Sequence, residues 1–166
     1  MSGPAPRLVT VRAEPLTPEA YAPFGSVVDL GRTQLHCSDG QYFVELLTLQ
    51  PRTGPVRRIN RHFDCVQLFA PHRQAGAGRK PMLVVVAPPW LSAERFDPAQ
   101  VRAFVADGTQ AFTFNVGTWH IGPRALDGTP LTLVNVQGER SNEEHTEEID
   151  LVELTGSVVE FELDAR

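Results

Sequence analysis

The sequence predicts one mainly β domain, folded as a sandwich or barrel with two short helices. Strand-length apolar segments recur along the chain, and about nine or ten of them can be counted. Most of the 14 prolines and 13 glycines lie between these segments, as expected for turns. The 166 residues suffice for one domain with a sizeable core and are few for two. No repeat or linker divides residues 1–166, and residues 1–6 are predicted to be a flexible tail.

The predicted strands are short runs rich in apolar and β-branched residues. The run MLVVVA at 82–87 is continuously apolar, which is typical of a strand buried on both faces. The β-rich run at 42–49 is followed by the turn sequence QPRTGP. The expected strands cover residues 8–11, 26–30, 42–49, 56–62, 64–69, 82–87, 110–114, 131–136 and 152–163.

Two capping pairs predict the helices. Thr-Pro at 17–18 and Asp-Pro at 97–98 each place an N-cap residue before a proline in the first helical position. They predict helices over 18–24 and 98–107, each closed by a glycine. Three apolar residues of the second segment fall at helical spacing: Val101, Phe104 and Val105.

Charge and motif content exclude several classes of protein. The chain has 15 basic and 20 acidic residues, a net charge of −5, and its small arginine cluster at 57, 58 and 61 is no basic patch. We therefore expect no nucleic-acid partner. The motifs GxGxxG, GK[ST] and GxSxG are absent, which removes most nucleotide enzymes and many serine hydrolases.

Cysteine usage and the N-terminal sequence predict a soluble cytoplasmic protein. Cys37 and Cys65 form no CxxC pair and are too few for a disulfide framework, so a reduced compartment fits best. The N-terminal segment has no apolar run long enough for a signal peptide or a membrane span. We expect no membrane partner.

Two segments, NRHFDCVQ at 60–67 and NVGTWH at 115–120, each place a histidine among polar neighbours at a strand or strand end. Their spacing resembles the two motifs of the cupin superfamily, HxH followed after three or four residues by Glu, and PxGxxH. The positions of a three-histidine, one-glutamate site are here Asn60, His62, Gln67 and His120. The resemblance implies a cupin-like β-barrel (a double-stranded β-helix) with both histidines facing one pocket.

This residue set weakens a metal site without removing it. Two imidazoles and two amides offer no anionic ligand for a divalent ion, whereas catalytic metals usually keep three strong ligands. If a divalent metal binds, His62, His120 and Gln67 are its expected ligands. Asp64 lies two residues after His62 and would share its strand face, so it could supply a carboxylate or pair with the imidazole.

Simpler interpretations of the two histidines remain open. His62 could be a surface residue paired with Asp64, and His120 an incidental neighbour of a core Trp119. Adjacent strand residues point to opposite faces, so a core Trp119 favours a pocket-lining His120. The acidic run at 143–148, which contains His145, is predicted to be a solvated surface.

Further segments recur in one order along most of the chain: LTPEAYAPFG at 16–25, RH with QLFAP at 61–71, LVVVA at 83–87, VRAF at 101–104, DGTQ at 107–110 and GTWH at 117–120. In order and spacing they resemble the ureidoglycolate lyase family of allantoin breakdown. The chain departs from the family pattern at Asn60 (usually Glu), Ile121 (usually His) and 135–138 (usually DRGG).

The resemblance implies a homodimeric enzyme of purine catabolism that cleaves ureidoglycolate, a small carboxylate, to glyoxylate and urea. Histidine suits acid–base work near neutral pH, so His62 and His120 are the expected catalytic pair, in either order. Asn60, Arg61, Gln67 and Trp119 are the expected substrate-binding residues. Arg61 could hold the carboxylate by a bidentate contact, but it shares the pocket with His62 only if the strand contains a bulge.

Two other functions remain as alternatives. A metal-dependent cupin enzyme, such as an isomerase or dioxygenase, would use the histidines as ligands. A non-catalytic cupin that binds a small carboxylate or sugar acid would explain the altered family positions.

Overall fold

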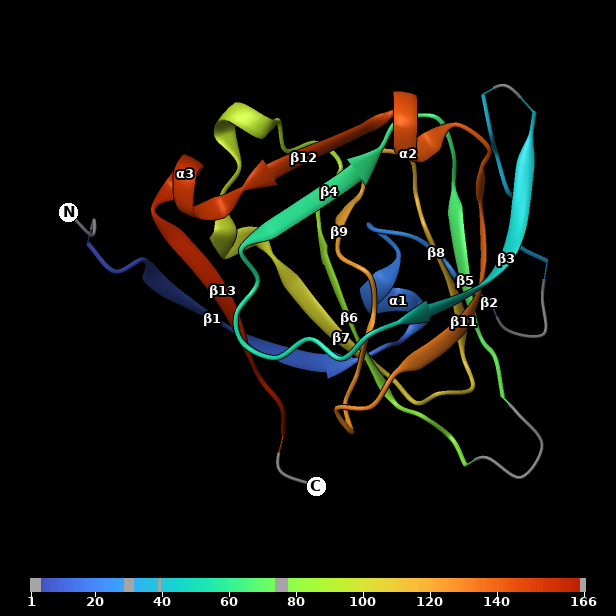
Figure 1. The fold of residues 1–166 in the computed structure, drawn as a ribbon, viewed down its shortest axis with the longest axis horizontal. Helices are drawn as coiled ribbons and strands as arrows, with labels where there is room; N and C mark the ends of the chain where they lie inside the picture. Colours follow the sequence, from blue (N-terminus) through green and yellow to red (C-terminus); the bar gives the residue numbers. More distant parts are fainter. Residues whose placement is uncertain (1–3, 29–31, 39, 74–77, 165–166) are drawn as a thin grey trace.

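The computed structural model describes residues 4–28, 32–38, 40–73 and 78–164, which form two facing β-sheets (Figure 1). The strands of the eight-stranded sheet are, in order, β12 (Thr146–Asp150), β4 (Arg58–His62), β9 (Trp119–His120), β6 (Met82–Ala87), β7 (Arg102–Ala106), β1 (Arg7–Pro15) and β13 (Ser157–Glu162), and β10 (Arg124–Ala125) also pairs with β6. The five-stranded sheet has the order β2 (Val27–Val28), β8 (Ala111–Phe114), β5 (Gln67–Pro71), β11 (Leu131–Gly138) and β3 (Tyr42–Leu49). The predicted mainly β fold class is confirmed.

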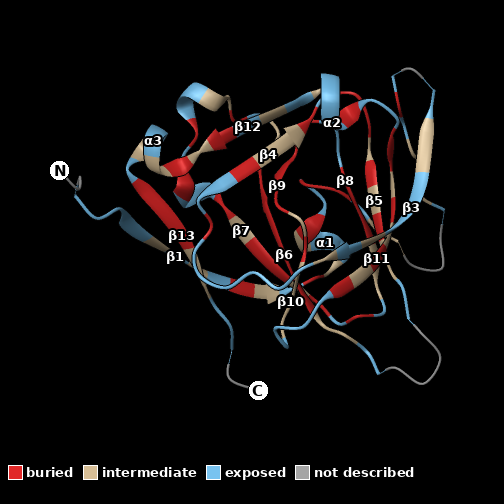
Figure 2. Ribbon diagram, viewed as in Figure 1, coloured by how far each residue is buried: buried red, intermediate tan, exposed pale blue. Residues whose placement is uncertain are grey.

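Strand β6 divides the core into two layers, as its continuous apolar sequence predicted. Every residue of β6 is buried, and the strand is red along its length in Figure 2. Val84 and Val86 point into the space between the sheets, where they pack with Phe104, Phe112 and other aromatic residues. Residues that alternate with them, such as Val85, face the other side of the sheet. The barrel interior and the outer face of the large sheet are therefore both apolar.

The helices are shorter than the sequence predicted. Helix α1 (Pro18–Tyr21) begins at the expected cap, since Thr17 Oγ1 accepts a hydrogen bond from the Ala20 backbone N–H at 3.2 Å. It ends before the expected boundary at residue 24. Two single 3₁₀ turns, η1 (Ala93–Arg95) and η2 (Pro98–Gln100), lie between β6 and β7.

The helix predicted over 98–107 is wrong. Asp97 does cap the Ala99 N–H, but only the turn η2 follows before the chain enters β7. Strand β7 pairs with β6 on one side and β1 on the other. It buries Phe104 in the inner core and Ala103 in the outer one. Burial on both faces of a central strand outweighs the helical spacing of its apolar residues.

The C-terminal part differs from the prediction in one element. The strand expected over 152–163 begins instead as helix α3 (Leu151–Thr155), which ends at Gly156 with φ of +66°, and continues as β13. The acidic run at 143–148 has no buried residue, as predicted for a solvated surface. It contains the end of α2 (Ser141–Glu144) and most of β12, which pairs with β4 in an unbroken register.

Some predictions concern residues only partly described. Residues 4–6 are exposed and have no regular structure, while residues 1–3 of the predicted tail lie outside the described part of the chain. Of the strand predicted over 26–30, residues 27–28 form β2 and residues 29–30 lie outside it as well. No helix among the described residues has the length and apolar character needed to cross a membrane.

Candidate functional site

His62 and His120 meet on the inner face of the large sheet. His62 ends β4, and His120 lies in the neighbouring β9, directly opposite Asn60. The imidazole centroids are 5.2 Å apart, and the side chains are 5% and 4% exposed. Phe114 of the facing sheet stacks on His120 at a centroid distance of 4.2 Å. Because His62 is buried inside the barrel, its interpretation as a surface residue is wrong.

The hydrogen bonds of both histidines fix the same tautomer. His120 Nδ1 lies 2.8 Å from the Thr118 carbonyl oxygen, which can only accept, so Nδ1 carries the proton. His62 Nδ1 lies 2.7 Å from Thr146 Oγ1. The Thr146 hydroxyl donates its own proton to the Ser141 carbonyl oxygen at 2.6 Å, so it accepts from His62. Both Nε2 atoms therefore carry a lone pair.

Burial keeps both rings neutral at pH 7. It is the largest cause that lowers the pKa of His120, to about 3, and the nearby His62 lowers it further. Burial also lowers the pKa of His62, although the Asp64 carboxylate acts in the opposite direction. A proton that enters this pair therefore goes to His62 first.

Asp64 lies beside the pair, but its hydrogen bonds go elsewhere. Its two carboxylate oxygens accept from the Ser141 hydroxyl at 2.8 and 2.7 Å. Gly138 permits this approach, because an added Cβ would lie 2.6 Å from Ser141 Oγ and 2.7 Å from the carboxylate. Asp64 acts on His62 through its charge, while Thr146 is the hydrogen-bond partner of the imidazole.

Gln67 presents a buried acceptor to the same interior. It lies opposite Phe114 in the β5–β8 pair. Its Nε2 donates to Asn135 Oδ1 and Gln137 Oε1 at 3.0 and 2.9 Å. The Glu45 carboxylate, which can only accept, takes a hydrogen bond from Asn135 Nδ2 at 3.0 Å and so fixes the orientation of the amides. Gln67 Oε1 is left buried with no partner among the described residues.

Asn60 connects the histidines to a surface pocket of about 320 Å³. Asn60 and His62 are two residues apart on β4 and so face the same side. Thr146, the partner of His62, also lines this pocket. The lining residues are Leu49, Gln50, Arg52, Asn60, Gly122, Pro123, Arg124, Thr146 and Glu148.

Arg61 and Trp119 are not brought to the histidine pair. The register of β4 with β12 is regular, so no bulge turns Arg61 inward. Its guanidinium lies over the Trp119 ring at 4.3 Å, on the outer face of the sheet. It is 2.7 Å from the Glu147 carboxylate and donates to the Leu91 carbonyl at 2.9 Å. Trp119 is fully buried in the outer core, where its Nε1 donates to the same carbonyl.

The donor set fits a divalent metal poorly. The two histidine Nε2 atoms and Gln67 Oε1 are neutral, and no carboxylate completes the group. Within the described ranges, no three His, Cys, Asp or Glu residues lie close enough together to hold a metal ion. We therefore derive the chemistry of the site from its side chains alone.

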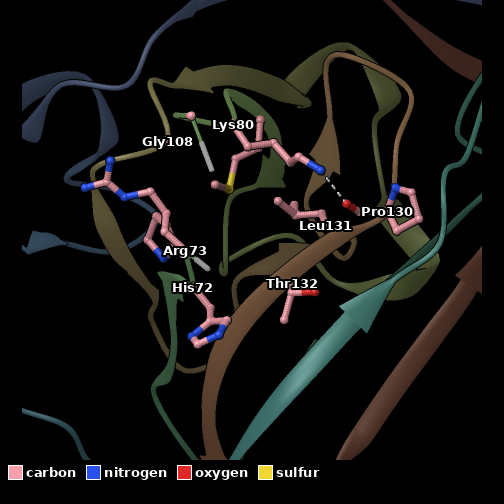
Figure 3. Close-up of a pocket in the computed structure, with 10 residues that line it drawn as sticks. His72, Arg73, Lys80, Gly108, Pro130, Leu131 and Thr132 are labelled. Atoms are coloured by element: carbon pink, nitrogen blue, oxygen red, sulfur yellow. Dashed lines mark hydrogen bonds between the residues drawn. The ribbon is translucent and has the colours of Figure 1, made fainter. Parts of the chain in front are cut away.

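A second pocket, of about 240 Å³, lies outside this site (Figure 3). His72, Arg73 and Lys80 line it together with Pro130 and Thr132. The Lys80 ammonium group is already committed, since it donates to the Thr129 hydroxyl and the Pro130 carbonyl at 2.7 Å each. None of the residues predicted for the site contributes to this pocket.

Comparison with known proteins identifies the family of the chain. A family model described as ureidoglycolate lyase matches residues 30–158. The chain belongs to the ureidoglycolate lyase family. A ureidoglycolate lyase of Burkholderia cepacia is 34% identical over 154 residues, which cover 80% of this chain and 82% of that protein. One from Burkholderia mallei is 33% identical over 132 residues (67% and 72%), and one from Azotobacter vinelandii is 30% identical over 155 (80% and 89%).

Solved structures give a more distant match. Bacillus subtilis oxalate decarboxylase is 14% identical, with a TM-score of 0.40 over 83% of this chain and 30% of that one. The ureidoglycolate lyase family assignment therefore rests on the sequence relatives and the family model.

The sequence alone did not reveal three residues of this region. Thr146 and Ser141 lie in or beside the acidic run, and only the pairing of β12 with β4 brings Thr146 to His62. Arg124 lies four residues after His120, and the short strand β10 carries it to the pocket beside Asn60. No spacing in the sequence indicates it, because His120 lies opposite Val86 and Arg124 opposite Leu83, three residues apart on β6.

Proposed function

We propose that this protein is a lyase of purine catabolism that cleaves ureidoglycolate to glyoxylate and urea. The observation that carries the proposal is the pair of buried, neutral histidines on the inner face of the sheet, whose Nε2 atoms have no hydrogen-bond partner among the described residues, in a member of this family. A neutral imidazole with a free Nε2 is a general base at neutral pH.

The reaction needs one proton to move from oxygen to nitrogen. Ureidoglycolate has one carbon that bears a hydroxyl, a carboxylate and a ureido nitrogen. A base removes the hydroxyl proton, the oxygen electrons form the carbonyl of glyoxylate, and the carbon–nitrogen bond breaks with its electron pair on nitrogen. The same proton, returned to that nitrogen, gives urea and restores the base.

We assign the proton transfer to His62 Nε2. The Asp64 charge favours the imidazolium of His62, whereas the pKa of His120 is lowered to about 3 by burial and by His62 itself. Thr146 holds the His62 ring by its Nδ1 and so directs Nε2 to the interior. His120 stays neutral, and its Nε2 accepts a hydrogen bond from the substrate.

We propose that the side-chain amides of Gln67 and Asn60 orient the substrate. Gln67 Oε1, buried and otherwise unsatisfied, accepts a hydrogen bond from a ureido N–H, which offsets the cost of leaving this oxygen unpaired. Asn60 contacts the substrate from the pocket side. Arg61 and Trp119, on the outer face, are proposed to act only by holding β4 and β9 in register, because the donors of Arg61 are already used.

The first test is product release by chelator-treated protein, measured as urea and glyoxylate, with and without Mn or Ni. Release without added metal supports direct acid–base chemistry by His62. Release only with metal would make the histidines ligands and contradict the proton-transfer assignment. No release under either condition would contradict the lyase proposal and favour the carboxylate-binding alternative.

We also propose that the protein is a cytoplasmic homodimer, as its family resemblance implies. In support, the edge strand β3 exposes Val44 and Leu46, which are 68% and 58% exposed. An exposed apolar edge strand is a surface that proteins usually cover. Light scattering of the purified protein should give the mass of two chains, and replacing Val44 and Leu46 with glutamate should halve it.

A further inference from the structure

The pocket beside Asn60 contains two arginines that the preceding mechanism does not use. Arg124 belongs to β10, and Arg52 follows β3, so two distant segments bring the guanidinium groups to one cavity. The groups are near enough for the charge of Arg52 to lower the pKa of Arg124, after burial as the larger cause. Two neighbouring cations are unfavourable unless an anion lies between them.

Arg124 is incompletely satisfied by the protein. One of its terminal nitrogens donates to the Gly54 carbonyl oxygen at 2.9 Å. Its Nε is buried and has no hydrogen-bond partner among the described residues. Nε and the terminal nitrogen on the same side of a guanidinium form the fork that binds a carboxylate with two hydrogen bonds. The Gly54 contact uses the other terminal nitrogen, so this fork is available when the guanidinium turns onto a ligand.

No described acidic residue neutralises the two arginines. None of the ion pairs among the described residues includes Arg52 or Arg124. Glu148 lines the same pocket, but its carboxylate lies 3.3 Å from Arg58 Nη1 and is half exposed. The pocket therefore has an excess of positive charge in a protein whose net charge is −5.

The pocket that contains the two arginines is also lined by residues that adjoin the histidines. Asn60 lies directly across from His120, and Thr146 holds His62. Both residues line the pocket together with the arginines, so the pocket adjoins the residues that contact or pair with the histidines. An anionic group bound at the arginines therefore lies in the same pocket as Asn60 and Thr146.

We propose that Arg124, assisted by Arg52, binds the carboxylate of the substrate and so orients its hydroxyl-bearing carbon towards His62. This inference rests on the proposed function, and it gives the carboxylate role that the sequence suggested for Arg61 to two residues that line the pocket beside Asn60. Arg124 is the larger contributor because it is half-buried, whereas Arg52 is exposed and its charge is screened by water.

The test compares the binding of glycolate and its neutral amide, glycolamide, by calorimetry. The unmodified protein should bind glycolate more tightly. Arg124→Gln should weaken glycolate binding about 10- to 100-fold and leave glycolamide unchanged, since it removes a charge-assisted pair of hydrogen bonds. Arg52→Gln should weaken it by less, about 2- to 5-fold.

Arg12→Gln is the matched control, since Arg12 forms an exposed ion pair with Asp164 away from the pocket. It should bind glycolate as the unmodified protein does. Arg124→Lys retains the charge and should recover part of the binding, which separates loss of the ligand contact from loss of fold. Equal binding of glycolate by the Arg124→Gln variant, or no preference of the unmodified protein for glycolate, overturns the proposal.

Turnover separates this inference from the proposed function. If the protein releases no urea but binds glycolate through Arg124, the lyase proposal fails and the carboxylate site stands. If it releases urea and Arg124→Gln leaves KM unchanged, the lyase proposal stands and the carboxylate site fails. A rise in KM with a smaller change in kcat supports both.

Discussion

The two faces of β4 and β9 carry residues of opposite kinds. On the inner face, His62, His120 and the neighbouring Gln67 each present an unused acceptor to the barrel interior. On the outer face, Arg61 has its charge paired with Glu147 and its guanidinium stacked on Trp119. A face whose polar atoms are all satisfied contributes to stability, while a face with unsatisfied polar atoms is available for a ligand. Strand alternation alone therefore places the unsatisfied acceptors and the paired arginine on opposite faces of the same two strands.

Substitutions on the inner face should lower activity, and His62→Asn should have the largest effect. The asparagine amide can still donate to Thr146 but provides no base in place of Nε2. We expect kcat to fall about 10²- to 10⁴-fold, the range for loss of a general base. Urea release measures the rate, and a thermal melt within a few degrees of the unmodified protein shows that the fold is kept. A rate within a few-fold of the unmodified protein would remove His62 from the mechanism.

Substitutions on the outer face should instead lower the free energy of unfolding. Trp119→Ala removes a fully buried ring, its edge contact with Phe96 and its support of Arg61. The free energy of unfolding should fall by about 3–5 kcal/mol, as for other large-to-small changes in cores. Guanidinium denaturation measures it, since urea is a product of the proposed reaction.

Trp119→Phe provides the control for that comparison. It keeps most of the buried ring but loses the hydrogen bond from Nε1 to Leu91. We expect a loss of about 1–2 kcal/mol with KM unchanged. If KM rises while stability is kept, Trp119 contacts the substrate, as the sequence suggested, and the separation of the two faces is wrong.

Features set by local sequence patterns could be predicted, whereas features set by contacts between distant segments could not. Local patterns predicted β6 and β3 with their observed bounds, since continuous apolar or β-branched runs are strong signals. The alternation of Trp119 and His120 correctly placed the histidine inside. The segment 98–107 was misread because its helical spacing is local, whereas its burial between β6 and β1 is not.

The candidate site shows the same division. The pair His62 and His120 could be predicted from motif spacing, but their common tautomer depends on Thr146, which only the pairing of β12 supplies. The carboxylate role was suggested for Arg61 because it adjoins His62 in sequence. In the structure Arg61 lies on the outer face, and Arg124 reaches the pocket through a strand of two residues that no pattern indicates.

The pH dependence of stability should reveal the burial of His120 on the inner face. His120 has a pKa lowered to about 3 in the folded protein, while an unfolded histidine titrates near 6.5. The unfolded state therefore binds more protons below pH 6.5, and folding stability should be complete above that value and decline as the pH falls towards 3. Between pH 6.5 and 4.5 we expect His120 to account for a loss of about 2–3 kcal/mol.

Denaturation curves at several pH values measure this loss, with His120→Gln as the comparison. The amide does not titrate, so the variant should lose less stability over the same interval. Exposed His72 is the matched control, since His72→Gln should leave the acid sensitivity as it is. Equal pH dependence in the His120→Gln variant would show that other groups dominate.

The smallest expected effect is at Gln67, whose unpaired Oε1 belongs to β5 of the facing sheet. Gln67→Met keeps the approximate volume but removes Oε1, so a ureido N–H in the site would lose its partner. We expect KM to rise about 5- to 20-fold with kcat changed less, the size of one neutral hydrogen bond in a buried site. Gln67→Glu keeps an acceptor but adds a buried charge near Glu45, so it should bind ureidoglycolate worse than Gln67→Met. If both variants keep the KM of the unmodified protein, the unpaired oxygen does not meet the ureido group, and only Asn60 and the histidines keep the roles proposed for them.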